Sequence, residues 1–87
     1  MKVIVIGMWH QGVVMASCLS RYHQVDCYDT NLNNLHLLKK GILPVNETGL
    51  KKLFYKSIKD SRLELIDKLD NLKKYDLESS IDWNLAI

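Results

Sequence analysis

The chain has 87 residues, of which 47% are hydrophobic and 25% are charged, with 12 Lys and Arg against 10 Asp and Glu. This length and composition are typical of one folded domain, residues 1–87, and exclude a disordered chain. The interspersed charges, including paired lysines on solvated helix faces, give no basic patch, so no nucleic-acid partner is expected. The longest apolar run, residues 3–6, is too short for a membrane span or a secretory signal. We therefore expect a cytoplasmic protein with no membrane contact.

Runs typical of buried strands alternate with the three-to-four-residue spacing of amphipathic helices. In chain order the predicted elements are a strand at 2–6, a helix at 10–22, a strand at 24–28, helices at 31–40 and 47–59, a strand at 62–66, a short helix at 67–74 and a strand at 81–87. Thr30 and Asn46 are the expected N-caps of the second and third helices, and Gly41 is the expected left-handed stop.

The apolar positions also predict which side of each helix is buried. In the first helix we expect Val14, Cys18 and Tyr22 to form the buried stripe, beside Val13. The small residues Ala16, Ser17 and Ser20 should let this helix pack close to the sheet. The second helix is expected to pack through Leu32, Leu35 and Leu38, and the third through the face that begins at Leu50 and Phe54.

This order of elements predicts an α/β fold: a Rossmann-like parallel sheet of three to four strands with helices on both faces. The expected strand order is 3-2-1, with residues 81–87 beside the first strand. The strand at 2–6 is continuously apolar over residues 3–6, and Asp82 and Asn84 of the 81–87 segment fit poorly as cover for its edge. We therefore expect this edge to stay open and the chain to form a homodimer or larger homo-oligomer.

One segment predicts a ligand. Gly7-Met8-Trp9-His10-Gln11-Gly12 follows the first strand and opens the first helix, where a dinucleotide-binding domain has its Gly-x-Gly-x-x-Gly turn and binds a pyrophosphate on free helix amides. Asp29 ends the second strand, seventeen positions after Gly12, as expected for the acidic residue that binds the adenosine ribose. The candidate cofactor-binding residues are Gly7, Trp9, His10, Gln11, Gly12 and Asp29.

Trp9 departs from this pattern, because it occupies the position of the middle glycine. That glycine lets the backbone come close to the pyrophosphate. We expect the indole to crowd this approach, so that a dinucleotide cofactor binds weakly or not at all.

The cysteines and histidines predict no chemistry of their own. Cys18 and Cys27 are expected to be buried, reduced thiols rather than a disulfide or a nucleophile. His10, His23 and His36 lie on separate predicted elements with no second ligand at metal spacing. We therefore predict no metal site and no catalytic residue.

Four further segments extend the match beyond the glycine turn. They are Met1-Lys2 at the opening of the first strand, Ser17-Cys18-Leu19, His23-Gln24-Val25-Asp26-Cys27-Tyr28-Asp29, and Gly41-Ile42-Leu43-Pro44 with Glu47-Thr48-Gly49-Leu50. Together they resemble the UDP-glucose/GDP-mannose dehydrogenase family, whose pattern reads Ala-Cys-Leu, His-x-Val-x-x-x-Asp and Gly-x-Leu-Pro…Glu-Pro-Gly-Leu. The resemblance covers about residues 1–76, and Thr48 departs from it where the family has proline.

The resemblance implies an NAD-binding Rossmann domain of enzymes that oxidise a nucleotide-sugar alcohol to a carboxylate in two NAD-dependent steps, through a cysteine thiohemiacetal. The family's catalytic cysteine and lysine lie beyond residue 87, and neither Cys18 nor Cys27 matches that cysteine. This chain alone is therefore expected to be inactive and to meet a nucleotide sugar only in a full-length context. Two alternatives stay open: a nucleotide- or anion-binding module without catalysis, and a structural or interaction domain.

Overall fold

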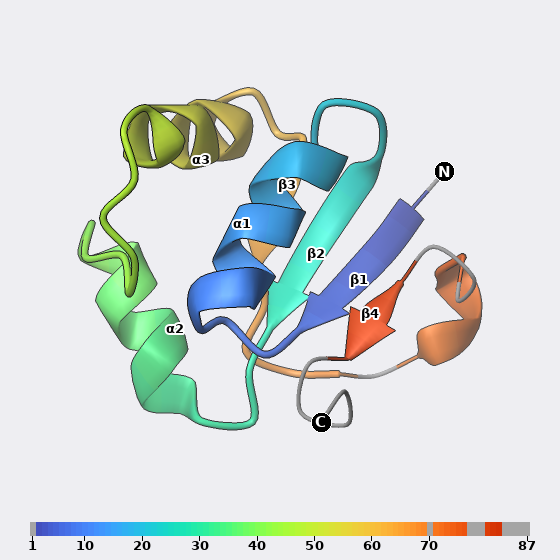
Figure 1. The fold of residues 1–87 in the computed structure, drawn as a ribbon. Coiled ribbons are helices and arrows are strands. Elements are labelled where there is room, and N and C mark those ends of the chain that lie inside the picture. The colour runs from blue at the N-terminus through green and yellow to red at the C-terminus, as the bar shows by residue number, and fades with distance from the viewer. Residues whose placement is uncertain (1, 70, 77–79, 83–87) are drawn as a thin grey trace.

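The computed structural model describes residues 2–69, 71–76 and 80–82 (Figure 1). In chain order the elements are β1 (Lys2–Ile6), α1 (His10–Leu19), β2 (Gln24–Tyr28), α2 (Leu32–Lys39), α3 (Leu50–Lys59), β3 (Leu63–Leu65), the 3-10 turn η1 (Leu72–Lys74) and β4 (Ile81–Asp82). The strands form one parallel sheet in the order β3-β2-β1-β4. The predicted α/β class, the order 3-2-1 and the place of the last strand beside β1 are confirmed. Residues 83–87 of that predicted strand lie outside the described residues.

The main core lies between the sheet and the three α-helices, which share one side of it (Figure 1). Side chains alternate along a strand, so every second residue of β1 and β2 faces these helices. Val3, Val5, Val25 and Cys27 are 0% exposed there. Their partners in the core are Met8, Val13, Ala16, Leu35, Leu38, Leu50, Phe54 and Leu63.

On the opposite face of the sheet, the described residues place a polar cluster beside the buried side chain of Ile4. Asp26, 1% exposed, points to this side between Val25 and Cys27. Tyr75 Oη donates a hydrogen bond to Asp26 Oδ2 at 2.6 Å, and Lys2 Nζ lies 3.4 Å from the same oxygen. The connection from β3 to β4, which contains η1, is thereby attached to the middle of β2.

The outer edge of β1 is covered by the segment that leads into β4. Asp76 N–H donates to Lys2 O at 2.7 Å, and Ile4 N–H donates to Ser80 Oγ at 2.9 Å. Val5 and Ile6 then pair with β4. The expectation of an open β1 edge, on which the homo-oligomer prediction depended, is therefore wrong. The oligomeric state itself stays a prediction.

The predicted packing face of α1 is confirmed only in part. Val13 is buried and Val14 packs against the core, but the helix ends at Leu19, and Tyr22 beyond it is 78% exposed. Cys18 is exposed as well, so only Cys27 is the buried thiol expected. The small residues Ala16, Ser17 and Ser20 are buried, and the two serines are satisfied by hydrogen bonds within α1 and to α3.

Three hydrogen bonds make this polar contact possible. Ser17 Oγ donates to Val13 O at 2.9 Å, and Ser20 Oγ lies 2.7 Å from Ser17 O and 2.9 Å from Ser57 Oγ of α3. Small hydroxyl residues let the two helices approach without leaving a buried polar atom unpaired.

Several element boundaries differ from the sequence-based ones. Asn31 rather than Thr30 caps α2, accepting a hydrogen bond from Asn33 N–H. Helix α3 starts three residues later than predicted, because Gly49 takes a left-handed conformation with φ 82° in place of a cap at Asn46. Gly41 has the expected left-handed conformation, with φ 88°.

The remaining differences are shorter elements and one exposed side chain. The third strand loses one residue at each end, and the predicted helix at 67–74 is reduced to η1. Leu32, at the start of α2, is exposed rather than packed. Within the described part of the chain, no helix is long and apolar enough to cross a membrane.

Candidate functional site

The carboxyl ends of β1 and β2 open onto a cavity of about 540 Å³. The loops that leave these two strands lie side by side below the sheet in Figure 1, and the first turn of α1 enters between them. The cavity is lined by Gly7, Trp9, His10, Gln11, Gly12, Asp29, Thr30, Asn31 and Asn34. The structure thus brings all six sequence-predicted residues together around one space, and adds three polar residues from the start of α2.

Two glycines shape the loop at the base of this cavity. Gly7 has φ 96°, a left-handed conformation that favours glycine, and its N–H donates to Tyr28 O at 2.8 Å. Gly12 lies so close to it that a Cβ on Gly12 would stand 1.6 Å from Gly7 O. No side chain fits there. This is the close helix-to-strand approach for which the last glycine of a dinucleotide-binding turn is needed.

The first turn of α1 presents backbone amides to the cavity. Trp9 is the N-cap residue and makes no side-chain cap hydrogen bond, and the first turn holds no acidic residue. The helical ladder begins with Val13 N–H, which donates to Trp9 O at 3.0 Å. The amides of residues 10–12 precede this bond, so they carry the partial positive charge that a helix offers to an anion.

Asp29 is almost completely buried, 4% exposed, and holds the loop rather than projecting into solvent. Its Oδ2 accepts hydrogen bonds from Met8 N–H at 2.8 Å and Asn34 Nδ2 at 2.9 Å, while Oδ1 accepts one from Asn31 N–H at 2.8 Å. A carboxylate has about four acceptor positions, so three are filled within the protein. One position on Oδ1 remains for a ligand hydroxyl.

Trp9 lies on the rim of the cavity. Its side chain is 60% exposed, whereas that of the preceding Met8 is 1% exposed and belongs to the core. The indole stacks on the His10 ring, with the centroids 5.3 Å apart and the planes inclined by 15°. The loop therefore presents a stacked aromatic pair to solvent.

A smaller hollow of about 200 Å³ adjoins the cavity on the side of the loop that follows α2. It is lined by Met8, Trp9, Asn34, Leu37, Ile42, Leu43 and Pro44. Trp9 and Asn34 line both spaces. A polar cavity and an apolar hollow thus meet at these two residues.

A known protein family matches the part of the sequence that forms this cavity. The family model described as "UDP-glucose/GDP-mannose dehydrogenase family, NAD binding domain" matches residues 1–78. The chain belongs to this family.

Relatives with known activities are longer enzymes. A UDP-glucose 6-dehydrogenase of Rhizobium meliloti (strain 1021) is 34% identical over 70 residues, which is 79% of this chain and 16% of that protein. The UDP-glucose 6-dehydrogenase YwqF of Bacillus subtilis (strain 168) is 38% identical over 64 residues, 72% of this chain and 14% of that enzyme. The chain therefore spans about a sixth of the length of the relatives it matches.

Solved structures give the same picture. A UDP-glucose dehydrogenase from the archaeon Pyrobaculum islandicum superposes with a TM-score of 0.68 at 26% identity, over 77% of this chain and 16% of that one. A ternary complex of GDP-mannose dehydrogenase from Pseudomonas aeruginosa gives 0.67 at 31% identity, over 76% and 15%. The Rossmann-type architecture and the NAD-binding-domain family are thus shown together.

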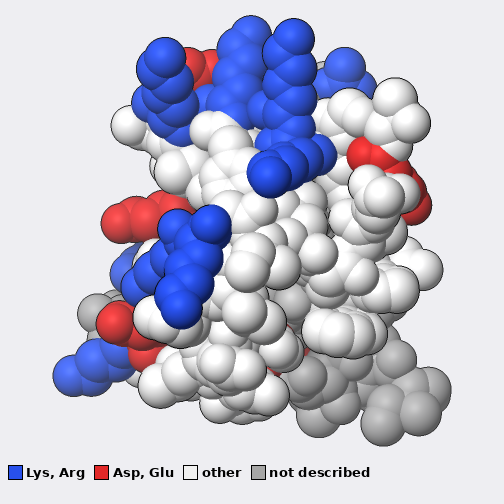
Figure 2. Space-filling model, turned by 90° about the vertical axis from the view of Figure 1, so that its left-hand side faces the viewer, with Lys and Arg blue, Asp and Glu red and all other residues white. Residues whose placement is uncertain are grey.

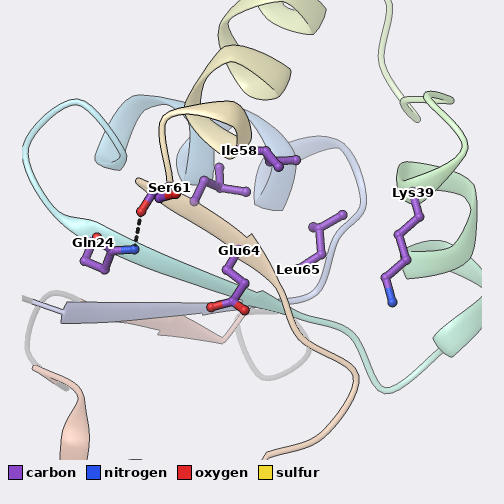
Figure 3. A pocket seen from close by; sticks show the side chains of 7 residues that line it. Gln24, Lys39, Ile58, Ser61, Glu64 and Leu65 are labelled. Carbon is purple, nitrogen blue, oxygen red and sulfur yellow. Dashed lines mark hydrogen bonds between the residues drawn. The ribbon is translucent and has the colours of Figure 1, made fainter.

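A second large space in this NAD-binding domain lies beside the outer strand β3 and has a volume of about 500 Å³. Figure 3 shows Gln24 turned toward Ser61, where Gln24 Nε2 donates to Ser61 O at 2.6 Å, and Lys39 reaching over from α2. Ile58, Leu63, Glu64 and Leu65 complete the lining. No described helix begins at this space, so it lacks the free amides that the first turn of α1 presents to the Gly7–Gly12 cavity.

Charge is concentrated away from the cavity. Figure 2 shows Lys and Arg side chains gathered over α3, where Lys51, Lys52, Lys56 and Lys59 are exposed, as predicted for solvated helix faces. The residues that line the 540 Å³ cavity include no Lys or Arg. Among the described residues, the positive charge nearest this cavity is therefore the partial charge at the amino end of α1 rather than a basic side chain.

The described residues assemble no catalytic group. Burial, followed by the neighbouring Asp26 carboxylate, raises the pKa of the Cys27 thiol, which keeps it protonated and unreactive. No three His, Cys, Asp or Glu residues come together to hold a metal within residues 2–69, 71–76 and 80–82.

Sequence reasoning missed Thr30, Asn31, Asn34 and the apolar hollow. Asn34 could have been found, since it lies five positions after Asp29, about one turn into the helix that begins at the carboxyl end of β2.

Proposed function

We propose that this chain binds NAD through its adenosine diphosphate half, at the amino end of α1, as the NAD-binding part of a cytoplasmic nucleotide-sugar dehydrogenase. The observation that carries the proposal is the contact between Gly12 and Gly7. It leaves no room for a Cβ and aims the first-turn amides of α1 into the cavity beside Asp29.

The roles of the residues follow from the donors and acceptors present. The amides of residues 10–12 bind the pyrophosphate, since they precede the helical ladder. The open position on Asp29 Oδ1 accepts one ribose hydroxyl, while the other three positions keep the loop in place. When bound, NAD supplies the hydride acceptor of the oxidation.

The substrate is proposed from the relatives, whose names specify UDP-glucose and GDP-mannose. A nucleotide sugar would be oxidised only where the family's catalytic cysteine and lysine are also present. The cysteines of the 87 residues are Cys18 and Cys27, one exposed on α1 and one buried in β2, and neither is placed for that role. We therefore propose that this chain by itself binds cofactor without turnover.

Binding by this chain should be weak, for reasons visible in the cavity. Its lining has no Lys or Arg to pair with the pyrophosphate, and Asp29 has one free acceptor position instead of two whole oxygens. The nicotinamide half would extend past the described part of the sheet. We expect a Kd of about 1 mM, equivalent to about −4 kcal/mol.

Calorimetry with NAD, ADP and nicotinamide mononucleotide tests the proposal. NAD and ADP should bind within about threefold of each other, and nicotinamide mononucleotide at least about tenfold more weakly, because the adenosine half makes the contacts. A micromolar Kd for NAD, or no binding of NAD and ADP at about 10 mM, would contradict the proposal.

A matched pair of variants locates the binding. Gln11→Glu puts a negative charge into the first turn of α1, which stabilises the helix but repels a phosphate, so ADP affinity should fall about tenfold with the fold intact. Gln24→Glu makes the same change at the β3 cavity and should leave ADP affinity unchanged. Equal affinity in both variants would place the nucleotide elsewhere.

A further inference from the structure

We propose that Trp9 is a stacking platform for the adenine base of the bound nucleotide, with the base seated in the apolar hollow between the indole and residues 42–44. The inference rests on the proposed function, and it assigns the base a place that neither the motif nor the family match specifies. It also reverses the effect expected for Trp9 from the sequence.

The exposure of Trp9 is the first observation. The side chain of Met8 is 1% exposed, whereas the indole of Trp9, the next residue, is 60% exposed. The loop therefore turns the indole toward solvent instead of packing it into the core. Stacking on His10, with 5.3 Å between the ring centroids, holds the indole in one orientation. A pre-oriented aromatic face loses little conformational freedom when a second ring covers it.

The hollow next to Trp9 has the chemistry of a base pocket. Five apolar side chains and one amide surround about 200 Å³, and Ile42 at its edge is 53% exposed. Aromatic and apolar surfaces that accept a flat ring, with a single polar group to orient it, are the usual composition of a small-molecule pocket. Stacking on such a surface is available to every base, since each has a π-face.

The hollow is continuous with the polar cavity, and this limits the kind of ligand that can fill both. A ligand that spans both spaces must be charged at one end and flat and apolar at the other, and Trp9 and Asn34 line both. A ribose held at Asp29 Oδ1 lies beside Asn34, because Asn34 Nδ2 bonds to the other oxygen of that carboxylate at 2.9 Å. The base then leaves the ribose toward the hollow.

Asn34 also favours adenine among the purines. Since its Nδ2 donates to Asp29, its Oδ1 is the atom left to meet a base, and a carbonyl oxygen accepts hydrogen bonds. The 6-amino group of adenine is a donor, whereas the 6-oxo group of hypoxanthine is an acceptor. ADP should therefore bind more tightly than IDP.

The decisive experiment compares ADP with the base-free probes inorganic pyrophosphate and ribose 5-phosphate, by titration of amide spectra. Trp9→Ala should weaken ADP binding about tenfold, and leave both base-free probes within about twofold. Trp9→Phe keeps an aromatic face and should stay within about threefold of the parent. Tyr22→Ala removes an aromatic that is 78% exposed elsewhere, and should change nothing.

The outcomes separate this inference from the proposed function. If ADP binds and Trp9→Ala binds it as tightly or more tightly, the indole obstructs or ignores the base, and the platform is wrong while the nucleotide site stands. If neither ADP nor pyrophosphate binds the parent chain, the proposed function fails and the platform with it. Loss of ADP and pyrophosphate alike in Trp9→Ala would point to a damaged loop and also contradict the platform.

One measurement needs no variant at the loop. In a Trp83→Phe background the emission comes from Trp9 alone, since the sequence contains 2 Trp. ADP should change this emission at saturation and ribose 5-phosphate should not. An equal response to both probes would contradict stacking by the base.

Discussion

Two buried aspartates, three positions apart, attach β2 to different parts of the molecule in different ways. Asp29 accepts three hydrogen bonds, from Met8, Asn31 and Asn34, all within the loop and the start of α2. Asp26 has Tyr75 and Lys2 as partners on Oδ2, while its Oδ1 has no hydrogen-bond partner among the described residues. The first carboxylate holds the loop that lines the 540 Å³ cavity, and the second docks the segment that carries β4.

The two carboxylates differ in the kind of donor that holds them. Backbone amides supply two of the three donors to Asp29, so the loop cannot move without breaking them. At Asp26 the donors are the ends of two long side chains, which can adjust. We therefore expect the loop that is bonded to Asp29 to be more rigid than the segment that is bonded to Asp26.

The largest effect is expected at the base of that loop. Gly12→Ala drives a Cβ to 1.6 Å from Gly7 O, and overpacking against backbone should lower the free energy of unfolding by more than about 3 kcal/mol. Gly41→Ala is the matched control, because its φ is +88° but nothing lies within 4 Å of the added Cβ, so only backbone strain of about 1 kcal/mol is expected. Urea unfolding of both variants measures the difference, and equal losses would show that the close contact is not required.

The next largest effect separates the two aspartates directly. Asp29→Ala should cost about 3 kcal/mol, because it leaves three donors without their acceptor, whereas Tyr75→Phe removes one hydrogen bond to Asp26 and should cost about 1.5 kcal/mol. Hydrogen exchange measures the size of each loss of stability and also shows which part of the molecule it affects.

The exchange patterns should not overlap. In Asp29→Ala the amides of Met8 and Asn31 should exchange faster, and in Tyr75→Phe that of Asp76, which bonds to Lys2 O at 2.7 Å. Faster exchange at all three amides in both variants would mean that the two regions open as one unit, contrary to the comparison.

The sequence predicted the sheet better than the helices that pack on it. The β-branched run of β1, with Gly7 after it, has no alternative as a helix, so its bounds were predicted to the residue. The packing face of α1 was predicted only in part. The burial of Val13 and of the small residues was expected, but the contact with α3 depends on the hydrogen bond from Ser20 to Ser57, 37 positions further along the chain. Apolar periodicity cannot register such a contact.

The part of the site that belongs to one local sequence motif could be predicted. The part that forms only when distant segments fold together could not. The glycine pattern and Asp29 gave the six residues that meet at the cavity. The hollow depends on residues 42–44 folding back to Trp9 after α2, a tertiary contact with no local signal. The hydrogen bonds that fill Asp29 were equally invisible, since a lone aspartate at a strand end predicts a free carboxylate.

We expect an adenine nucleotide to bind at the amino end of α1, and mapping ADP on assigned amide spectra tests this expectation most directly. The largest shifts should fall on residues 10–12 and 29–34, followed by residues 42–44. Gln24 and Ser61, at the β3 cavity of about 500 Å³, should not move. Shifts that are largest at Gln24 and Ser61, or absent throughout at about 10 mM ADP, would contradict it.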